Sequence, residues 1–170
     1  IAADPVVTAV LKPFQDQGQE LLDEVISETD AKLEGDRDVV RSEQTNLGHL
    51  LGHAYRTFNL VNADFGVMNS GGVRDSIAAG TIAYRDVLTV QPFGNFVTKA
   101  TMTGAEVKDY LNVVATKTAG SGAYAQLDNI SMTVDCAAGE VDITDINNRG
   151  FNLTDTYSFS VISFSAAGGD

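Results

Sequence analysis

The spacing of apolar residues changes along the chain, and this change constrains the fold more than any other feature of the sequence. In the first part, segments with apolar residues at helical spacing alternate with short apolar runs that are typical of strands. From about residue 130 onward, strand-like segments separated by Gly and Asn turns predominate. We therefore expect an α+β (mixed α/β) fold, in which helices and strands alternate first and strands follow one another late.

Local signals place the individual elements. Expected helices span residues 4–19, 46–59, 84–90 and 103–114. Expected strands span residues 24–29, 65–68, 96–102, 130–134, 141–146 and 157–164. Asp4 can cap the first helix and Pro5 suits its first turn, whereas Pro13 indicates a kink or an early end. Thr103, with Glu106 three residues later, forms a capping-box pattern at the start of another helix.

The charge of the chain limits its partners. Its 170 residues fit one domain, and 11 Lys and Arg against 23 Asp and Glu give a net charge of −12. This balance counts against nucleic acid and anionic membrane surfaces, which need a basic footprint. A small anionic ligand is compatible with it, because a few placed Arg side chains can hold one locally. No apolar run approaches the ~18–20 residues of a membrane helix, so we expect no membrane span.

The sequence offers no convincing metal or nucleophile site. His49 and His53 have the spacing of a zinc pair, but the Glu of a metalloprotease motif would stand at Leu50, and no third ligand is near in sequence. We expect surface or structural histidines. Cys136 is the one cysteine, and no base is suggested beside it. The charged segment Lys32–Arg41 is expected to be a loop; its acidic stretch Glu34–Asp38 does not have the spacing of a calcium loop and is expected to be solvated. No catalytic residue and no metal ligand is therefore predicted in this segment.

Three turn segments carry the ligand-binding signal. Asn69–Arg74 follows an apolar run, and its two Gly residues let a backbone approach a ligand closely, although a plain turn is the simpler interpretation of this segment alone. Gln91–Asn95 and Ser163–Asp170 each place a Phe on a turn or strand end, and the second finishes on an acid. Two aromatic rings beside Arg and a carboxylate suit a planar base joined to a polyol.

Three motifs, taken together and in their order along the chain, resemble the C-terminal domain of the 5′-nucleotidase family. They are Asn69–Arg74, Pro92–Asn95 and Ser163–Asp170. The family pattern has Asn/Ser-Gly-Gly-Gly-Ile-Arg, Pro-Phe-Gly-Asn and Asn-Phe-x-Ala-x-Gly-Gly-Asp-Gly. Ser70 and Val73 replace a Gly and the Ile of the first motif. The similarity covers nearly the whole chain, and it is greatest to the bacterial periplasmic UDP-sugar hydrolase/5′-nucleotidase branch.

The resemblance implies one part of a two-domain enzyme. In the family, an N-terminal calcineurin-like metallophosphoesterase domain holds two divalent metal ions and the catalytic residues, and the C-terminal domain supplies the substrate pocket. Residues 1–20 would form an interdomain-type helix, and residues 21–170 a substrate-binding domain with a mixed sheet flanked by helices, truncated at its C-terminal end. No cofactor would be bound by this segment. A periplasmic or secreted location is implied, although residues 1–11 show no basic leader.

The resemblance also assigns the nucleoside-binding residues. Phe93 and Phe164 would sandwich the base, and Asp170 would accept hydrogen bonds from the ribose hydroxyls. Gly122 would line the base pocket through its backbone. The ligand would be a nucleotide or a nucleoside.

The remaining assigned residues are polar. Arg41 and Arg74 would contact the phosphate side, and Asn69 and Asn95 would donate or accept hydrogen bonds with the ligand. Two other interpretations stay open: a nucleotide-binding module of a related 2′,3′-cyclic phosphodiesterase or other enzyme, and a non-catalytic structural domain. As part of a 5′-nucleotidase or UDP-sugar hydrolase, this segment alone is expected to lack hydrolytic activity.

Overall fold

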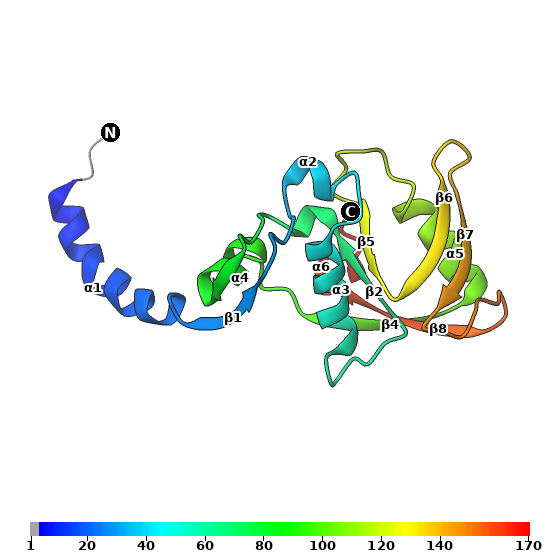
Figure 1. Ribbon diagram of the computed structural model, residues 1–170, viewed down its shortest axis with the longest axis horizontal. Helices are drawn as coiled ribbons and strands as arrows, with labels where there is room; N and C mark the ends of the chain where they lie inside the picture. The colour runs from blue at the N-terminus through cyan, green and yellow to red at the C-terminus, as the bar shows by residue number, and fades with distance from the viewer. Residues whose placement is uncertain (1–3) are drawn as a thin grey trace.

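The fold begins with a helix that projects from the rest of the protein. The structure is a computed structural model that describes residues 4–170, so the first three residues of the expected 1–20 helix lie outside it. Helix α1 (Pro5–Leu22) begins where the sequence predicts, because the Asp4 carboxylate accepts hydrogen bonds from two backbone amides. Figure 1 shows α1 extending away from the sheet. It continues through Pro13, so of the two alternatives for this proline the early end is wrong. None of the residues of α1 is buried, and water can hydrate the carbonyl that Pro13 leaves unpaired.

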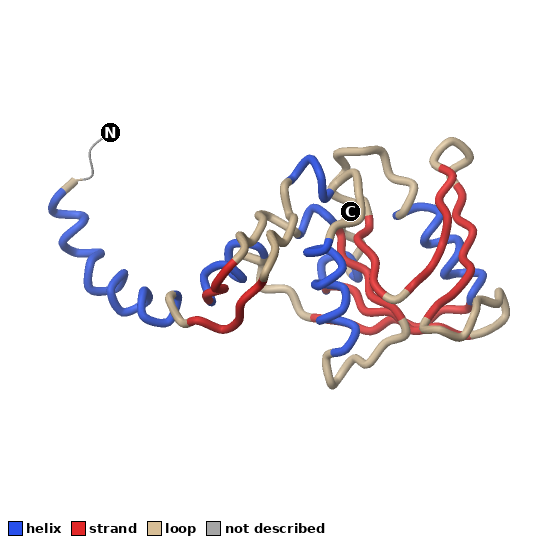
Figure 2. The backbone as a smooth tube through the Cα atoms, viewed as in Figure 1, coloured by secondary structure: helices blue, strands red, loops and turns tan. Residues whose placement is uncertain are grey.

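The remaining elements confirm the mixed α/β class. The further helices are α2 (Arg37–Val40), α3 (Asn46–Thr57), the 3-10 turn η1 (Ser70–Gly72), α4 (Tyr84–Val90), α5 (Gly104–Val114) and α6 (Ser163–Ala166). The strands are β1 (Val25–Thr29), β2 (Phe65–Asn69), β3 (Gly80–Ala83), β4 (Val97–Thr103), β5 (Ala125–Asp128), β6 (Ile130–Asp135), β7 (Glu140–Ile146) and β8 (Thr156–Ile162). In Figure 2 the strands lie between helices, and β1 and β3 form a small sheet near α4, apart from the main one.

Three sequence-based expectations are corrected. The segment 32–41 is not wholly a loop, because the Asp36 side chain caps the short helix α2 and Val40 is fully buried. The expected strand 157–164 ends at Ile162, and α6 follows at once. Strands β3 and β5 were not expected, because neither four-residue segment has a clear apolar alternation; each forms by pairing with a distant strand.

A mixed sheet forms the centre of the fold. Its strand order is β4-β8-β2-β5, with β2 and β8 parallel and the other pairs antiparallel. Every residue of β2 is buried. Phe65 stacks on Phe159 with ring centroids 5.2 Å apart, in a core cluster that includes α5 and the β6–β7 hairpin. A second cluster lies on the side of α3, which approaches β2 so closely that a Cβ on Gly66 would lie 2.4 Å from the Gly52 carbonyl oxygen.

The parallel pair determines where the turn motifs meet. Because β2 and β8 run in the same direction as neighbours, their carboxyl ends lie at one edge of the sheet. The turn η1 follows β2 there, and α6 follows β8. Ligands of open α/β sheets commonly bind outside such strand ends. The first and third motifs are thus brought together by strand direction.

Candidate functional site

A cavity of about 560 Å³ lies at this edge of the sheet. All eight residues predicted from the sequence line it: Arg41, Asn69, Arg74, Phe93, Asn95, Gly122, Phe164 and Asp170. Its volume lies in the range of small-molecule sites, about 300–1,000 Å³. Four further residues line it, of which Gly71, Gly72 and Gly94 belong to the quoted motifs. Ile162 was missed, because an Ile at the end of a strand gives no functional signal.

The two phenylalanine rings face solvent at the cavity and not the protein core. Phe93 is 51% exposed and Phe164 is 47% exposed. The Phe164 ring lies against the backbone of Gly169, where an added Cβ would come within 2.5 Å of two ring carbons. The guanidinium of Arg74 lies 5.8 Å from the Phe93 ring centroid and donates to the Gly71 carbonyl. Both rings are therefore available to stack on a planar ligand.

Positive charge gathers on one part of the cavity. Arg41 is 9% exposed, its Nη1 donates to the Gly120 carbonyl, and its Nε has no hydrogen-bond partner in the part of the chain that the structure describes. Burial, followed by the neighbouring charges of Arg37 and Arg74, lowers the pKa of Arg41. An anion bound here would relieve this repulsion and would pair the free Nε–H. Arg37, the first residue of α2, acts on Arg41 through its charge but does not line the cavity, and its sequence position alone does not reveal this role.

The Asn69–Asp170 pair forms a polar part of the lining. Asn69 Nδ2 donates to a carboxylate oxygen of Asp170, whereas Asn69 Oδ1 is buried and has no hydrogen-bond partner among the described residues. The residue itself is 8% exposed. A buried acceptor without a partner is unfavourable by about 1–3 kcal/mol, so a donor on a ligand would be stabilised at this position.

The loop before β5 is held against η1 and completes one wall. Ser70 is fully buried, and its hydroxyl donates toward the Ser121 and Gly122 carbonyls. The Gly71 amide also donates to the Gly122 carbonyl, at 2.8 Å. A Cβ on Gly71 would lie 3.1 Å from Gly122 atoms, so the two backbones touch. Ser70, which replaces a family Gly, thus anchors the Gly122 wall.

The histidine pair lies elsewhere, at the surface beside a buried carboxylate. His49 Nε2 is 3.3 Å and His53 Nδ1 is 3.6 Å from Asp128, which also pairs with Arg56. Asp128 lies far from both histidines in sequence, so no local pattern could reveal it. Arg56 forms an ion pair with the Asp128 carboxylate. Among residues 4–170, no group of three or more His, Cys, Asp or Glu is arranged to hold a metal ion.

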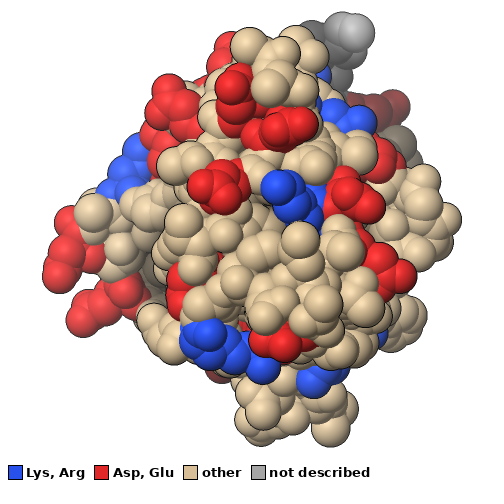
Figure 3. All heavy atoms as spheres, turned by 90° about the vertical axis from the view of Figure 1, so that its right-hand side faces the viewer, with Lys and Arg blue, Asp and Glu red and all other residues tan. Residues whose placement is uncertain are grey.

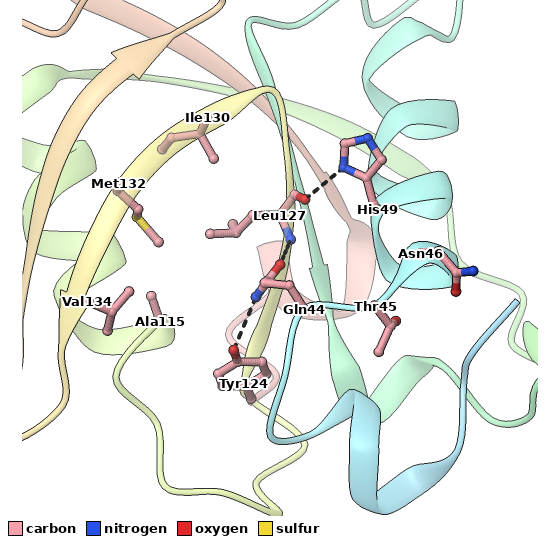
Figure 4. A pocket seen from close by; sticks show the side chains of 10 residues that line it. All are labelled: Gln44, Thr45, Asn46, His49, Ala115, Tyr124, Leu127, Ile130, Met132 and Val134. Carbon is pink, nitrogen blue, oxygen red and sulfur yellow. Dashed lines mark hydrogen bonds between the residues drawn. The ribbon is translucent and has the colours of Figure 1, made fainter.

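A second cavity of about 440 Å³ lies between α3, β5 and β6. Figure 4 shows the apolar side chains of Ile130, Met132 and Val134 on one side and Gln44 on another. The Gln44 amide bonds to Tyr124 Oη and to the backbone of β5. The walls of this second cavity are apolar, and the polar groups at its rim already form hydrogen bonds within the protein. The first cavity differs, because its lining includes the polar atoms Asn69 Oδ1 and Arg41 Nε described above.

On the face seen in Figure 3, Lys and Arg side chains lie singly among acidic and uncharged ones, and no continuous basic patch is visible.

Within the described part of the chain, no helix has both the length and the apolar character needed to cross a bilayer.

The fold and the motifs at the cavity define a nucleotidase-type C-terminal domain. Residues 25–170 match the family described as 5′-nucleotidase, C-terminal domain, and the chain belongs to this family. Over its whole length it is 55% identical to a 5′-nucleotidase of Vibrio vulnificus (strain CMCP6) and 45% identical to the protein UshA of Escherichia coli (strain K12). The chain spans 30% of the length of each of these relatives.

A solved structure supports the same conclusion. The crystal structure of a 5′-nucleotidase precursor from Thermus thermophilus matches 95% of this chain with a TM-score of 0.82 and 27% sequence identity. The match covers 34% of that protein. The likeness therefore includes nearly all of the fold described above.

Proposed function

We propose that this chain binds the nucleotide substrate of a larger, metal-dependent 5′-nucleotidase or UDP-sugar hydrolase. One observation carries the proposal: a single cavity combines two solvent-facing rings, clustered arginines and an acidic side chain. Two of its buried polar atoms, Asn69 Oδ1 and Arg41 Nε, have no hydrogen-bond partner among residues 4–170. Such atoms favour a polar ligand, because pairing them removes a desolvation penalty.

Each part of a nucleotide has a counterpart in this cavity. We expect a planar base to stack on Phe93 and Phe164, since aromatic faces stack well on heterocycles. The Asp170 carboxylate can accept hydrogen bonds from two vicinal ribose hydroxyls. The guanidinium groups of Arg41 and Arg74 suit a phosphate, to which they can donate in a planar fork. The residues of this chain therefore bind and orient the substrate.

The hydrolytic step is proposed to take place in another domain. A metal-dependent phosphoesterase needs clustered Asp, His and Asn ligands, and the described residues offer no such cluster. Two divalent ions in an N-terminal metallophosphoesterase domain would supply the activated water. The 170-residue chain alone is expected to bind nucleotides in the micromolar-to-millimolar range without hydrolysing them. The location proposed for the whole protein is the periplasm or the exterior of the cell.

Calorimetric titration of the chain tests the binding claim. AMP, UMP, adenosine and UDP-glucose are the ligands, and ribose 5-phosphate is the ligand without a base. Phe93→Ala and Phe164→Ala should each weaken AMP binding by about 5- to 150-fold, which corresponds to about 1–3 kcal/mol of stacking. Phe58→Ala is the matched control, because Phe58 is 52% exposed but does not line the cavity.

Two results would contradict the proposal. The first is a wild-type chain that binds none of these ligands at millimolar concentration. The second is AMP binding that both cavity variants leave unchanged, which would place the ligand elsewhere.

A further inference from the structure

The two ring-bearing segments are joined by one side-chain oxygen. Asn95 lies on the turn that carries Phe93, and Ser163 begins α6, which carries Phe164. Asn95 Oδ1 accepts hydrogen bonds from Ser163 Oγ and from the Phe164 amide, each at 3.1 Å. The carbonyl side of Asn95 is thus engaged within the protein, and its Nδ2 is the part left for a ligand.

Ser163 connects this junction to the main sheet. Its hydroxyl accepts a hydrogen bond from the Phe96 amide at 3.1 Å, and its own amide donates to the Phe96 carbonyl at 2.8 Å. These bonds continue the β4–β8 ladder, which ends with Val97 opposite Ile162. The Ser163 hydroxyl therefore lies between a rigid sheet on one side and the Asn95 side chain on the other.

The Phe164 ring has little freedom on its other side. Its edge lies against the Gly169 backbone without room for a Cβ, and the Gly169 amide donates to the Phe164 carbonyl at 3.0 Å. Helix α6 has only four residues and no side-chain cap from the residue before it. The Asn95 oxygen supplies a partner for an amide that such a short helix would leave free.

We propose that Ser163 is a positioning residue for the planar part of the ligand, and that it acts through Asn95 to set the gap between the Phe93 and Phe164 rings. This inference rests on the proposed function. A ring pair stacks on both faces of a base only at van der Waals separation. A gap wider by about 0.5–1 Å loses a quarter to a half of each contact, so small shifts of the turn against α6 change affinity.

The test compares a ligand that has a base with one that lacks it. Ser163→Ala should weaken AMP binding by about three- to tenfold, the size expected for one net hydrogen bond, and leave ribose 5-phosphate binding unchanged. Ser163→Thr keeps the hydroxyl and should restore AMP affinity. Ser165→Ala is the matched control on the same helix, because the Ser165 hydroxyl has no hydrogen-bond partner within the described range 4–170.

A double-mutant cycle tests whether Ser163 acts through Asn95. In an Asn95→Ala background, the additional Ser163→Ala change should have almost no effect on AMP binding. If the two losses add in full, Ser163 does not act through Asn95. Should the alanine variant not fold, Ser163→Cys replaces it, because a thiol keeps the size but is a weak donor and acceptor.

The outcomes separate this inference from the proposed function. Equal losses for AMP and ribose 5-phosphate indicate a general structural role and overturn the inference, as does unchanged AMP affinity in Ser163→Ala. Neither result affects the proposed function. A wild-type chain that binds no nucleotide refutes the proposed function itself, and the inference falls with it.

Discussion

The fully buried side chain of Gln126 should be decisive for the stability of the segment that carries Arg41. Gln126 Nε2 donates to the Val40 carbonyl at 2.8 Å and also to the Glu43 carbonyl. Its Oε1 accepts from the Thr45 amide at 2.8 Å. The side-chain amide of one β5 residue thus pairs three backbone groups, one at the end of α2 and two on the connection from α2 to α3.

Gln126→Leu keeps the approximate volume and removes these bonds. The Glu43 carbonyl lies at a partly exposed position and can turn to water, whereas the Val40 carbonyl and the Thr45 amide stay buried. Each buried group without a partner is unfavourable by about 1–3 kcal/mol, so the free energy of unfolding should fall by about 2–6 kcal/mol in total. For a domain of this size, Tm should fall on the order of 10 °C.

Urea denaturation followed by circular dichroism measures this change, with Gln15→Leu on the exposed face of α1 as the control. The Gln126 variant should also bind ribose 5-phosphate more weakly, because the displaced segment carries Arg41. A loss of stability below about 1 kcal/mol would refute the reasoning, since it would mean that water reaches the freed groups.

Two further predictions concern pH and the ring pocket. Hydrogen bonds from Lys32 and then from a backbone amide hold the pKa of Glu34 at about 2, below its usual 4.5. The ionised Glu34 carboxylate therefore stabilises the folded state fully above pH 4.5, and this contribution to the free energy of unfolding is lost as the pH falls toward 2. The difference in unfolding free energy between wild type and Glu34→Gln should shrink over this interval, and a constant difference contradicts the assignment. Gly169→Ala places a Cβ 2.5 Å from the Phe164 ring, so it should weaken AMP binding more than ribose 5-phosphate binding in paired titrations. Gly18→Ala, in open space on α1, should leave both affinities unchanged; equal losses in the Gly169 variant would refute a ring-specific effect.

Local sequence signals were sufficient for several elements. The Asp4 cap and the Thr103–Glu106 capping box are both present as predicted, because such caps involve residues only two to three positions apart. Helix α3 likewise lies within the expected range 46–59, where apolar residues recur at helical spacing. Strand β5 was missed because its signal is not local: Gln126 and Asp128 are polar and yet buried, through partners far away in sequence.

The amino-acid sequence by itself determined the α/β class, the family and the residue types that suit a nucleotide. Only the tertiary structure decided that these residues share one cavity, because parallel pairing of β2 with β8 brings together turns that lie about 90 residues apart. It also decided that the Asn95 oxygen is engaged by Ser163, and that Asp128 pairs with Arg56. Contacts of this kind depend on strand order and direction, which the period of a single segment does not encode.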